Sequence, residues 1–421
     1  MTRTSARPAR FLVFAAGVLI ALSAAAPPEY PSAADLPSRP EMPNPLVTRG
    51  GAKLETKRDW FERGRPELKA LFDHYMYGTA PDAPSVVSSK VEREDDRFLA
   101  GKATLREITL KFGPAGAPPI HLLLIVPNDR KRRAPVFVGP NFYGNHTVVA
   151  DPKVALPTVW VSQRAPSKKA GGTPGDGRGT QVDTWAADAV VGRGYALATF
   201  YCGDVAPDHP GHTDGVHPHY PGYDWGTVRA WAWGTSRVAD YLTTLPEIDR
   251  AKMAVVGHSR LGKAALVAGA YDDRFAVVIS HQAGCGGSAP SRGKVGESVK
   301  QINDHFPHWF NAAFKTFNDR AEALPMDQHE LVALVAPRAV LFSNAQDDAW
   351  ANPEGQFQAL KAAEPVYKLL KAGGLESDLT PPTGKLSSGT LGYVIRPGKH
   401  SMTREDWGFF LDFADRHLGR R

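Results

Sequence analysis

Cysteine is scarce in this chain, with only Cys202 and Cys285 among 421 residues. A small fold held together by several disulfides is therefore excluded. In an oxidising compartment the two residues form one bridge, or they are two separate small buried side chains. Both alternatives stay open at this point, because a sequence contains no distance between two thiols.

Long apolar runs are also absent. The one marked run, Phe11 to Leu22, has about 12 residues, whereas a helix that spans a bilayer takes about 20. Arginines at positions 3, 7 and 10 precede it, and the small residues Ser23 to Ala26 follow as an Ala-x-Ala cleavage site. We interpret residues 1–26 as a secretory signal peptide, with an uncleaved anchor as the alternative. The mature protein is then expected to be secreted or periplasmic.

A strong excess of one charge is missing too. The formal net charge is +6, and removal of the signal peptide takes three arginines from it. No stripe of Lys and Arg marks one helix, so nucleic acid is not an expected partner. Apolar residues make up 42% of the chain, enough for a large core, and no internal repeat occurs. We expect an extended leader over 27–55 and a single catalytic domain over 56–421, acting as a monomer.

Beyond the leader, short apolar runs alternate with amphipathic segments. Helical periodicity covers 60–77, 228–242, 404–417 and a segment that starts near residue 261. Strands are predicted at 104–112, 120–126, 135–138, 195–201, 253–256, 275–280, 339–343 and 392–395. Residues 167–180, rich in Gly, Arg and Lys, predict a surface loop. The alternation of strand and helix indicates an α/β fold with a mostly parallel central sheet covered on both faces.

The first chemical motif is the run Gly-His-Ser-Arg-Leu-Gly-Lys over 257–263. It follows a predicted strand directly and opens a predicted helix. A serine on such a sharp turn presents its hydroxyl above the sheet, as in the nucleophile elbow of α/β-hydrolases. The second glycine, Gly262, stands one place later than in the usual G-x-S-x-G. We predict that Ser259 is the nucleophile of a serine esterase; the alternative is a serine that caps an ordinary helix.

A serine nucleophile needs a base and a supporting acid on loops after later strands. Of the 14 histidines, only His400 follows a late predicted strand and precedes the C-terminal helix. The acid is expected after the strand that ends near Ser343, where Asp347 and Asp348 compete. A carboxylate there orients the imidazole and stabilises the imidazolium. The other aspartate must then be a helix cap or a surface charge.

The run around Ser259 resembles the G-C-S-R-x-G-K signature of the glucuronoyl esterases, carbohydrate esterase family fifteen. Further similar segments lie at 140–146, 231–234, 324–329, 336–338, 348–350 and 399–400. The resemblance therefore covers nearly all of the chain beyond about residue 55. It implies an α/β-hydrolase fold, a three-layer sandwich. It also implies cleavage of the ester that joins a glucuronic acid group of xylan to an alcohol of lignin.

The resemblance also implies roles for charged residues beside the serine. Ser259 is the implied nucleophile and His400 the base, while Arg260 places its guanidinium on the developing oxyanion. A fixed cation stabilises such a charge with little reorganisation. Without the family, Arg260 reads as a member of a surface ion pair.

Three more residues match the sugar-binding side of the family. Lys263, one helical turn beyond Ser259, donates to sugar hydroxyls in this interpretation, and Glu297 accepts from them. Trp350 matches the aromatic side chain against which the sugar packs. Taken alone, Lys263 reads as a solvated helix lysine and Trp350 as a core residue.

Two departures from the family matter. Gln282 stands where many members carry the triad glutamate, and glutamine cannot balance an imidazolium charge. The acid must then come from the later loop, where the spacing favours Asp348 over Asp347. His258 replaces a cysteine that fungal members pair with another beside the catalytic histidine. Ser401 occupies that second place, so no such bridge can form, and His258 is expected to be structural or to tune the polarity of the pocket.

Several potential metal ligands occur between residues 208 and 219: Asp208, His209, His212, Asp214, His217 and His219. Prolines and glycines separate them, unlike the helix or hairpin spacing of tight zinc sites, so we expect no metal. Ester hydrolysis by a triad requires no cofactor. Two rival functions remain: an acetyl- or feruloyl-xylan esterase on the same fold, and a non-catalytic carbohydrate-binding pseudoenzyme.

Overall fold

The computed structural model describes residues 1, 30–84, 86–162, 164–165, 177–211, 214–293 and 295–419. Apart from Met1, the predicted signal peptide lies outside the described residues, as does most of the loop predicted at 167–180. Within the described part of the chain, no helix is long and apolar enough to cross a membrane.

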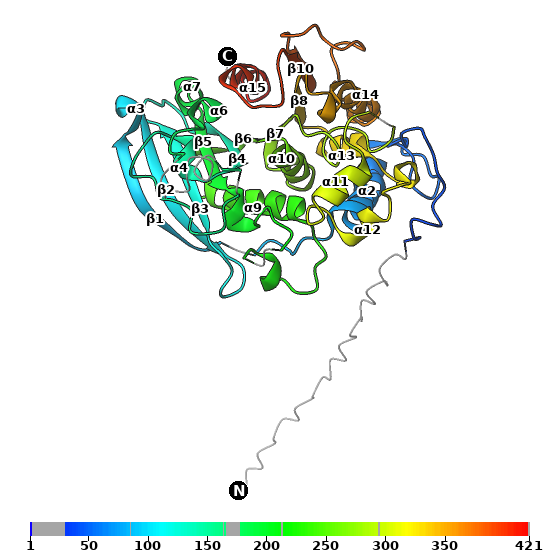
Figure 1. Ribbon diagram of the computed structural model, residues 1–421, viewed down its shortest axis with the longest axis horizontal. Coiled ribbons are helices and arrows are strands. Elements are labelled where there is room, and N and C mark those ends of the chain that lie inside the picture. Colours follow the sequence, from blue (N-terminus) through cyan, green and yellow to red (C-terminus); the bar gives the residue numbers. More distant parts are fainter. Residues whose placement is uncertain are drawn as a thin grey trace.

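A mixed, mostly parallel sheet runs through the molecule (Figure 1). In the described residues it has ten strands in the order β1-β2-β3-β5-β4-β6-β7-β8-β10-β9. The strands are β1 Val86–Arg97, β2 Ala103–Phe112, β3 Ile120–Pro127, β4 Ala134–Asn141, β5 Ala196–Tyr201, β6 Ile248–His258, β7 Phe275–His281, β8 Ala339–Ala345, β9 Ser387–Ser388 and β10 Leu391–Arg396. The strands from β5 to β10 pair in parallel, whereas β1, β2, β3 and β9 pair antiparallel. The predicted α/β-hydrolase fold class is confirmed.

Helices cover both faces of the sheet (Figure 1). On one face lie α9 Thr227–Leu242, α10 Arg260–Tyr271, α13 Gln328–Val335 and α14 Pro353–Leu369, and on the other α6 Val182–Trp185, α7 Ala187–Gly192 and α15 Arg404–His417. Successive side chains of a strand point to opposite faces. In β4, Val136 and Val138 therefore belong to one core, and Phe137 belongs to the other. The central strands are mostly apolar where both of their faces are buried.

The remaining helical segments are short, apart from a longer one near the N-terminus, in which α1, η1, α2 and η2 follow one another over residues 57–77. They are α1 Lys57–Asp59, α2 Arg65–Phe72, α3 Phe98–Gly101, α4 Asn145–Val148, α8 Cys202–Val205, α11 Val299–His305 and α12 Ala312–Lys315, with the 3₁₀ turns η3 His217–His219, η4 Ala321–Ala323 and η5 Ala349–Ala351. The helix predicted at 60–77 is α2 flanked by two π-helical turns, η1 Trp60–Gly64 and η2 Asp73–Tyr77. It ends at Gly78, which has a φ of 77°. A left-handed glycine is a common helix stop.

The edge strand β1 was not predicted. Its sequence, Val-Val-Ser-Ser-Lys-Val-Glu-Arg-Glu-Asp-Asp-Arg, has no apolar alternation over its second half. It pairs with β2 alone and leaves its charged side chains at the surface. Charged residues on an edge strand also discourage further strand pairing.

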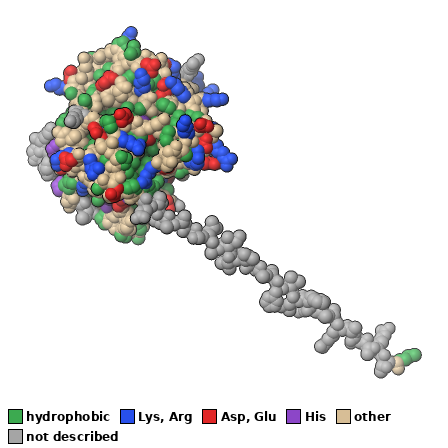
Figure 2. All heavy atoms as spheres, turned by 90° about the vertical axis from the view of Figure 1, so that its right-hand side faces the viewer, with side chains coloured by type: hydrophobic (Ala, Val, Ile, Leu, Met, Phe, Trp, Pro, Cys, Tyr) green, Lys and Arg blue, Asp and Glu red, His purple; other side chains and the backbone are tan. Residues whose placement is uncertain are grey.

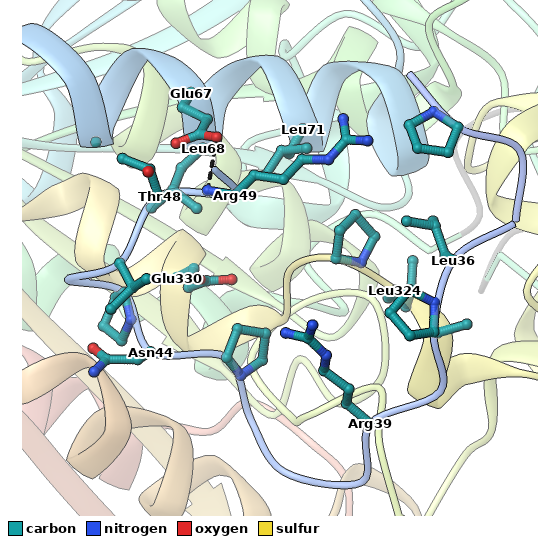
Figure 3. A pocket seen from close by; sticks show the side chains of 18 of the residues that line it. Leu36, Arg39, Asn44, Thr48, Arg49, Glu67, Leu68, Leu71, Leu324 and Glu330 are labelled. Carbon is teal, nitrogen blue, oxygen red and sulfur yellow. Dashed lines mark hydrogen bonds between the residues drawn. The ribbon is translucent and has the colours of Figure 1, made fainter. Parts of the chain in front are cut away.

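The leader wraps around a cavity of about 440 Å³ beside α2 and α13 (Figure 3). Leu36, Leu68 and Leu71 form apolar walls, and the carboxyl group of Glu330 faces the space. Burial raises the pKa of Glu330 to about 8. None of the predicted site residues lines this cavity, so it belongs to the packing of the leader and not to the predicted chemistry.

Cys202 and Cys285 are both buried and both free, so they are two separate thiols rather than a bridge.

On the face drawn in Figure 2, basic and acidic side chains lie side by side, and no large area of that face carries one sign.

Candidate active site

The turn that carries Ser259 is a strained elbow between β6 and α10. Ser259 has φ 57° and ψ −126°, a conformation that L-residues seldom adopt. A methyl group on Gly257 would collide with the Leu261 carbonyl, and one on Gly262 would lie 2.9 Å from the carbonyl oxygens of Gly257 and His281. Gly262, although it stands one place later than the second glycine of the usual motif, therefore still allows the backbone segments to approach closely. The elbow lifts the serine to the carboxyl edge of the parallel strands.

His400 and Asp348 form a hydrogen-bonded pair at the same edge. The imidazole Nδ1 lies 2.6 Å from Oδ2 of Asp348. Asp348 is 5% exposed and also accepts from the backbone N–H of Ala351. Asp347 is exposed, and its backbone N–H donates to Gly398. The structure thus brings Asp348, and not Asp347, to the predicted base.

A cavity of about 340 Å³ opens where these elements meet. Ser259, Arg260 and His400 all line it, and Asp348 holds His400 from behind. The other lining residues are Phe142, Tyr143, Trp160, Ser162, Arg164, Gln181, Thr184, Tyr201, Cys202, Asp208, His258, Ser401 and Met402. The predicted nucleophile, the predicted base and the side chain of Arg260 therefore share one cavity.

Arg260 is held in this cavity by an ion pair with Asp208. Asp208 also accepts hydrogen bonds from His308 at 2.9 Å and Trp309 at 2.7 Å. Burial alone raises the pKa of Asp208, but these two donors and the guanidinium outweigh it and bring the pKa to about 2. The guanidinium carbon lies 5.0 Å from the ring centroid of Trp309. Arg260 is thus a member of an ion pair, as expected from the sequence without the family resemblance. The pair, however, lies in the wall of the cavity.

The three predicted sugar-binding residues lie outside the lining of this cavity. Lys263 is buried, and its Nζ donates to the carbonyl oxygens of Ala283 and Cys285, each at 2.5 Å. Burial lowers the pKa of Lys263, and the Glu297 carboxylate acts in the opposite direction. The interpretation of Lys263 as a solvated helix lysine is therefore wrong.

Glu297 and Trp350 are adjacent. The backbone N–H of Glu297 donates to the carbonyl oxygen of Trp350 at 3.0 Å. The side chain of Trp350 is not a core residue, because 48% of it is exposed. Lys263 interacts electrostatically with Glu297, so the three residues occupy one side of the site, toward β7 and β8.

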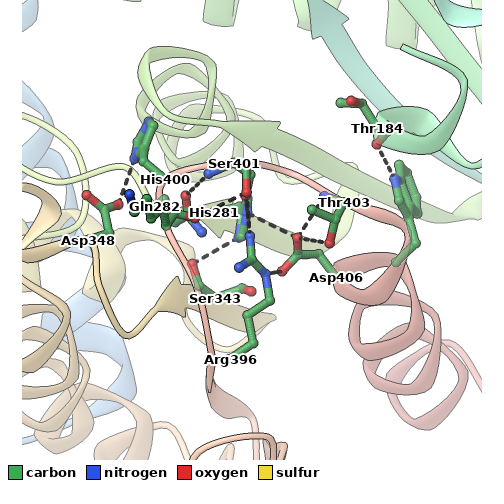
Figure 4. Close-up of polar contacts among 12 residues, drawn as sticks. Thr184, His281, Gln282, Ser343, Asp348, Arg396, His400, Ser401, Thr403 and Asp406 are labelled. Carbon is green, nitrogen blue, oxygen red and sulfur yellow. Dashed lines mark hydrogen bonds and ion pairs between the residues drawn. The ribbon is translucent and has the colours of Figure 1, made fainter. Parts of the chain in front are cut away.

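The loop after His400 is held by a hydrogen-bonded clamp that sequence reasoning missed (Figure 4). The backbone N–H of Ser401 donates to Oε1 of Gln282 at 2.9 Å. The Ser401 carbonyl accepts from Nε2 of His281 at 2.9 Å and from Arg396 at 2.6 Å. Arg396 in turn forms a buried ion pair with Asp406 at 2.7 Å. The sequence offers one signal for this clamp: Arg396 is a charged residue at the end of the apolar strand β10.

Three imidazole rings pack beside the elbow, with their planes tilted relative to one another. The His258 ring lies between His400, at 4.7 Å between centroids, and His281, at 5.0 Å. Burial and the two neighbouring rings lower the pKa of His258 well below its usual range. A neutral ring therefore packs against the predicted base, in line with the structural role expected for His258.

The segment over residues 208–219 contains several potential metal ligands. Among the described residues, no group of three or more His, Cys, Asp and Glu side chains is arranged to hold a metal ion. His212 lies outside the described residues. Asp208, the first member of the segment, serves Arg260 instead.

Comparisons with known sequences identify similar proteins. The pattern of a family described as "Glucuronyl esterase, fungi" matches residues 179–371. A protein called "Carbohydrate esterase MZ0003", from an unknown prokaryotic organism, is 42% identical over 390 residues. That match covers 90% of this chain and 89% of the relative.

Solved structures of carbohydrate esterases are also similar to this chain. A promiscuous CE15 esterase from the marine bacterial metagenome is 41% identical, with a TM-score of 0.83, over 92% of this chain and 99% of its own. A glucuronoyl esterase from Solibacter usitatus is 36% identical, with a TM-score of 0.84, over 92% of this chain and 100% of its own. CE15 denotes carbohydrate esterase family 15. Both similarities span nine tenths of the chain.

Proposed function

We propose a function from one premise: this chain belongs to the glucuronoyl esterases of carbohydrate esterase family 15. It is accordingly a carboxylic ester hydrolase that acts on glucuronoyl esters. The finer proposal is hydrolysis of (4-O-methyl-)glucuronic acid esters, such as lignin–glucuronoxylan cross-links, by Ser259, His400 and Asp348. The shared cavity of Ser259 and the His400–Asp348 pair is the observation that supports it.

The first half-reaction forms an acyl-enzyme. Ser259 attacks the uronate ester carbonyl while His400 takes the proton of its hydroxyl. The buried carboxylate of Asp348 keeps the imidazole in the productive tautomer and stabilises the imidazolium. When the tetrahedral intermediate collapses, the carbon–oxygen bond to the alcohol breaks, and His400 returns the proton to the leaving oxygen.

Arg260 supplies positive charge to the oxyanion in this scheme. Its side chain is anchored by Asp208, so the cation is already in place when the oxyanion forms. The backbone N–H of Arg260 belongs to the first turn of α10, where amides have no partner within the helix. In this fold, the residue after the nucleophile contributes such an amide to the oxyanion hole.

The second half-reaction releases the acid. Water, activated by His400, attacks the acyl-enzyme, and glucuronate leaves with its carboxylate free. During both steps, we assign the sugar to the side of Lys263, Glu297 and Trp350. The exposed Trp350 ring offers an apolar face, and the Glu297 carboxylate accepts from hydroxyl groups.

Kinetics on matched esters test the proposal. We expect the wild-type enzyme to hydrolyse methyl and benzyl glucuronate faster than the corresponding galacturonates. Ser259→Ala should remove this turnover, a loss of at least 10⁴-fold, and leave the circular dichroism spectrum unchanged. Retained turnover in that variant would falsify the assignment of the nucleophile. Glu297→Ala should raise KM for uronate esters with less effect on kcat.

An acetyl- or feruloyl-xylan esterase is the second candidate. One relative is described as promiscuous, which favours testing it directly. Acetylated xylan and glucuronate esters in competition separate the two activities, since the preferred ester has the larger kcat/KM. Labelling of Ser259 by a serine-directed phosphonate argues against the carbohydrate-binding pseudoenzyme.

The location of the protein is a further part of the proposal. The basic head, short apolar run and Ala-x-Ala site over residues 1–26 support export and cleavage. Mass spectrometry of the protein from a host's exported fraction should show an N-terminus near residue 27. A mature protein that begins at Met1 contradicts cleavage. The expected monomeric state also stays a prediction, which light scattering can test.

A further inference from the structure

The turn between β3 and β4 carries a run of four basic residues that the proposed chemistry does not use. All four side chains are exposed: Arg130, Lys131, Arg132 and Arg133. Arg130 donates to the carbonyl oxygen of Pro127 at 2.7 Å, and none of the four forms an ion pair with another described residue. Adjacent like charges repel one another, and an anionic partner relieves that repulsion.

Two other segments bring cations to the same edge of the sheet. The backbone N–H of Asn128 donates to the carbonyl oxygen of Lys102 at 2.9 Å, beside the start of β2. The backbone N–H of Ala134 donates to the carbonyl oxygen of Glu247 at 2.8 Å, close to the exposed Arg250 at the start of β6. Lys102 is exposed as well. Together, six exposed cations form what we call the basic edge: Lys102, Arg130, Lys131, Arg132, Arg133 and Arg250.

Carboxylates are fewer at the basic edge. Asp96, Asp129 and Asp249 lie within or beside its segments. Glu247 is already paired with Arg106. Cations therefore outnumber the carboxylates that have no ion pair among the described residues, and the edge presents a positive potential to solvent.

The basic edge lies across the sheet from Ser259. Strands β4 and β6 pair in parallel, so both begin at the basic edge and both end near the elbow. The seven steps of β4 from Ala134 to Asn141, at about 3.3 Å each, span roughly 23 Å. Phe142, the next residue, lines the cavity of Ser259. A small ester bound in that cavity does not reach the basic edge, whereas a polymer does.

The composition of the basic edge restricts the kind of polyanion that fits it. The large exposed apolar side chains of the described residues, among them Tyr223 and Trp350, lie elsewhere. Sites for single-stranded nucleic acid add aromatic side chains for stacking, and amphipathic membrane anchors add apolar ones. A hydrated chain with dispersed carboxylates needs neither. Its carboxylates suit arginine, whose guanidinium group can bind each of them with two parallel hydrogen bonds.

From these observations, and resting on the proposed function, we infer that the basic edge is a second, non-catalytic binding surface for an acidic polysaccharide. The partner is a xylan chain that carries free glucuronate groups. Each cleaved ester adds one carboxylate to the polymer, so the attraction grows where the enzyme has already acted. Binding at the edge raises the effective concentration of uncleaved esters near Ser259, on the same chain or a neighbouring one.

Polymer binding without turnover tests this surface. A serine-directed phosphonate on Ser259 first blocks the cavity, and Kd is then measured for ester-free glucuronoxylan and for the same polymer with its carboxyl groups reduced to alcohols. The edge variant combines four substitutions: Arg130→Gln, Lys131→Gln, Arg132→Gln and Arg133→Gln. At low salt it should bind glucuronoxylan about tenfold more weakly than the wild type, as expected for the loss of four exposed ion pairs. The difference should disappear in about 1 M NaCl, where the Debye length is about 3 Å.

The matched control removes four charges from scattered exposed positions outside the basic edge: Lys53→Gln, Lys315→Gln, Lys371→Gln and Lys385→Gln. Its Kd for glucuronoxylan should change less than twofold. The reduced polymer should bind weakly to all three proteins. Without the phosphonate, both variants should hydrolyse methyl glucuronate at the wild-type rate, because neither set of residues lines the cavity of Ser259.

Equal weakening in the two variants would reduce the effect to net charge and overturn the surface. Unchanged affinity in the edge variant would also overturn it, as would equal affinity of the wild type for the reduced polymer. Tighter binding to duplex DNA or to phosphatidylglycerol vesicles, lost in the edge variant alone, would assign the edge to that partner instead. Turnover of methyl glucuronate by the unlabelled wild type tests the proposed function separately, since binding of the polymer requires no hydrolysis.

Discussion

The elbow that carries Ser259 and the loop that carries His400 are built in different ways. In the elbow, the close approaches are to backbone atoms: those of Gly257, Leu261 and Gly262 within the turn, and the carbonyl oxygen of His281 in β7. In the histidine loop, Ser401 is held by side chains from distant segments, including Gln282, which lies 119 positions away. The first is a backbone device, and the second is a side-chain clamp.

This difference predicts different responses to substitution. A backbone contact has no rotamer with which to move away, so an added methyl group strains the elbow directly. When one residue of the clamp is substituted, only the hydrogen bond of that residue is lost, and the remaining bonds still hold Ser401. We therefore expect large stability effects at the elbow and graded kinetic effects at the loop.

The largest effect is expected at the carboxylate that supports the loop. Asp348→Asn should reduce kcat by about 10³- to 10⁴-fold, because an amide does not stabilise the imidazolium and favours the wrong tautomer. Asp347→Asn, on the exposed neighbour, should change kcat less than twofold. The measurement is steady-state kinetics on methyl glucuronate, and the reverse ranking would show that the acid is misassigned.

At the elbow, Gly257→Ala should lower the free energy of unfolding by about 3 kcal/mol, since the new methyl meets the Leu261 carbonyl. Gly408→Ala is the matched control. It lies inside α15 with open space around its Cα, so alanine there should be neutral or stabilise by up to about 1 kcal/mol. Urea unfolding measures both. Equal stability of the two variants would contradict the backbone device.

Acid should weaken the anchor of Arg260, the residue that follows the elbow serine. The pKa of Asp208 is about 2 in the folded state, below the ordinary value of about 3.9. The carboxylate therefore stabilises the fold above pH 4, and that contribution of about 2 kcal/mol disappears as the pH falls from 4 to 2. Urea unfolding from pH 6 to 2 should show this loss in the wild type but not in Asp208→Asn. Parallel curves for the two proteins would refute it.

The smallest effect is expected within the clamp. Gln282→Leu removes the acceptor of the Ser401 N–H, so kcat should fall about fivefold while KM stays constant. Gln282→Glu keeps an acceptor oxygen and should restore most of kcat. A change confined to thermal stability, with kcat unaltered in both variants, would reduce Gln282 to a packing role.

Local sequence was sufficient where contiguous residues decide the structure. The strand over 253–256, the glycines around Ser259 and the helix that follows interact with one another, so their order predicts the turn. The same holds for the C-terminal helix, found at Arg404–His417 as predicted. The charged β1 escaped prediction because its partner, and not its own periodicity, makes it a strand.

By itself, then, the sequence determined the α/β class, the elbow and the family resemblance, because short-range periodicity and contiguous motifs encode them. Only the tertiary structure decided which aspartate reaches His400, that Asp208 anchors Arg260, and that Gln282 and Arg396 hold Ser401. It also left Cys202 and Cys285 unbridged. Apart from Arg396 and Ser401, which are five positions apart, these pairings join residues at least 52 positions apart in the sequence. No local preference specifies which distant side chains folding brings within hydrogen-bonding distance.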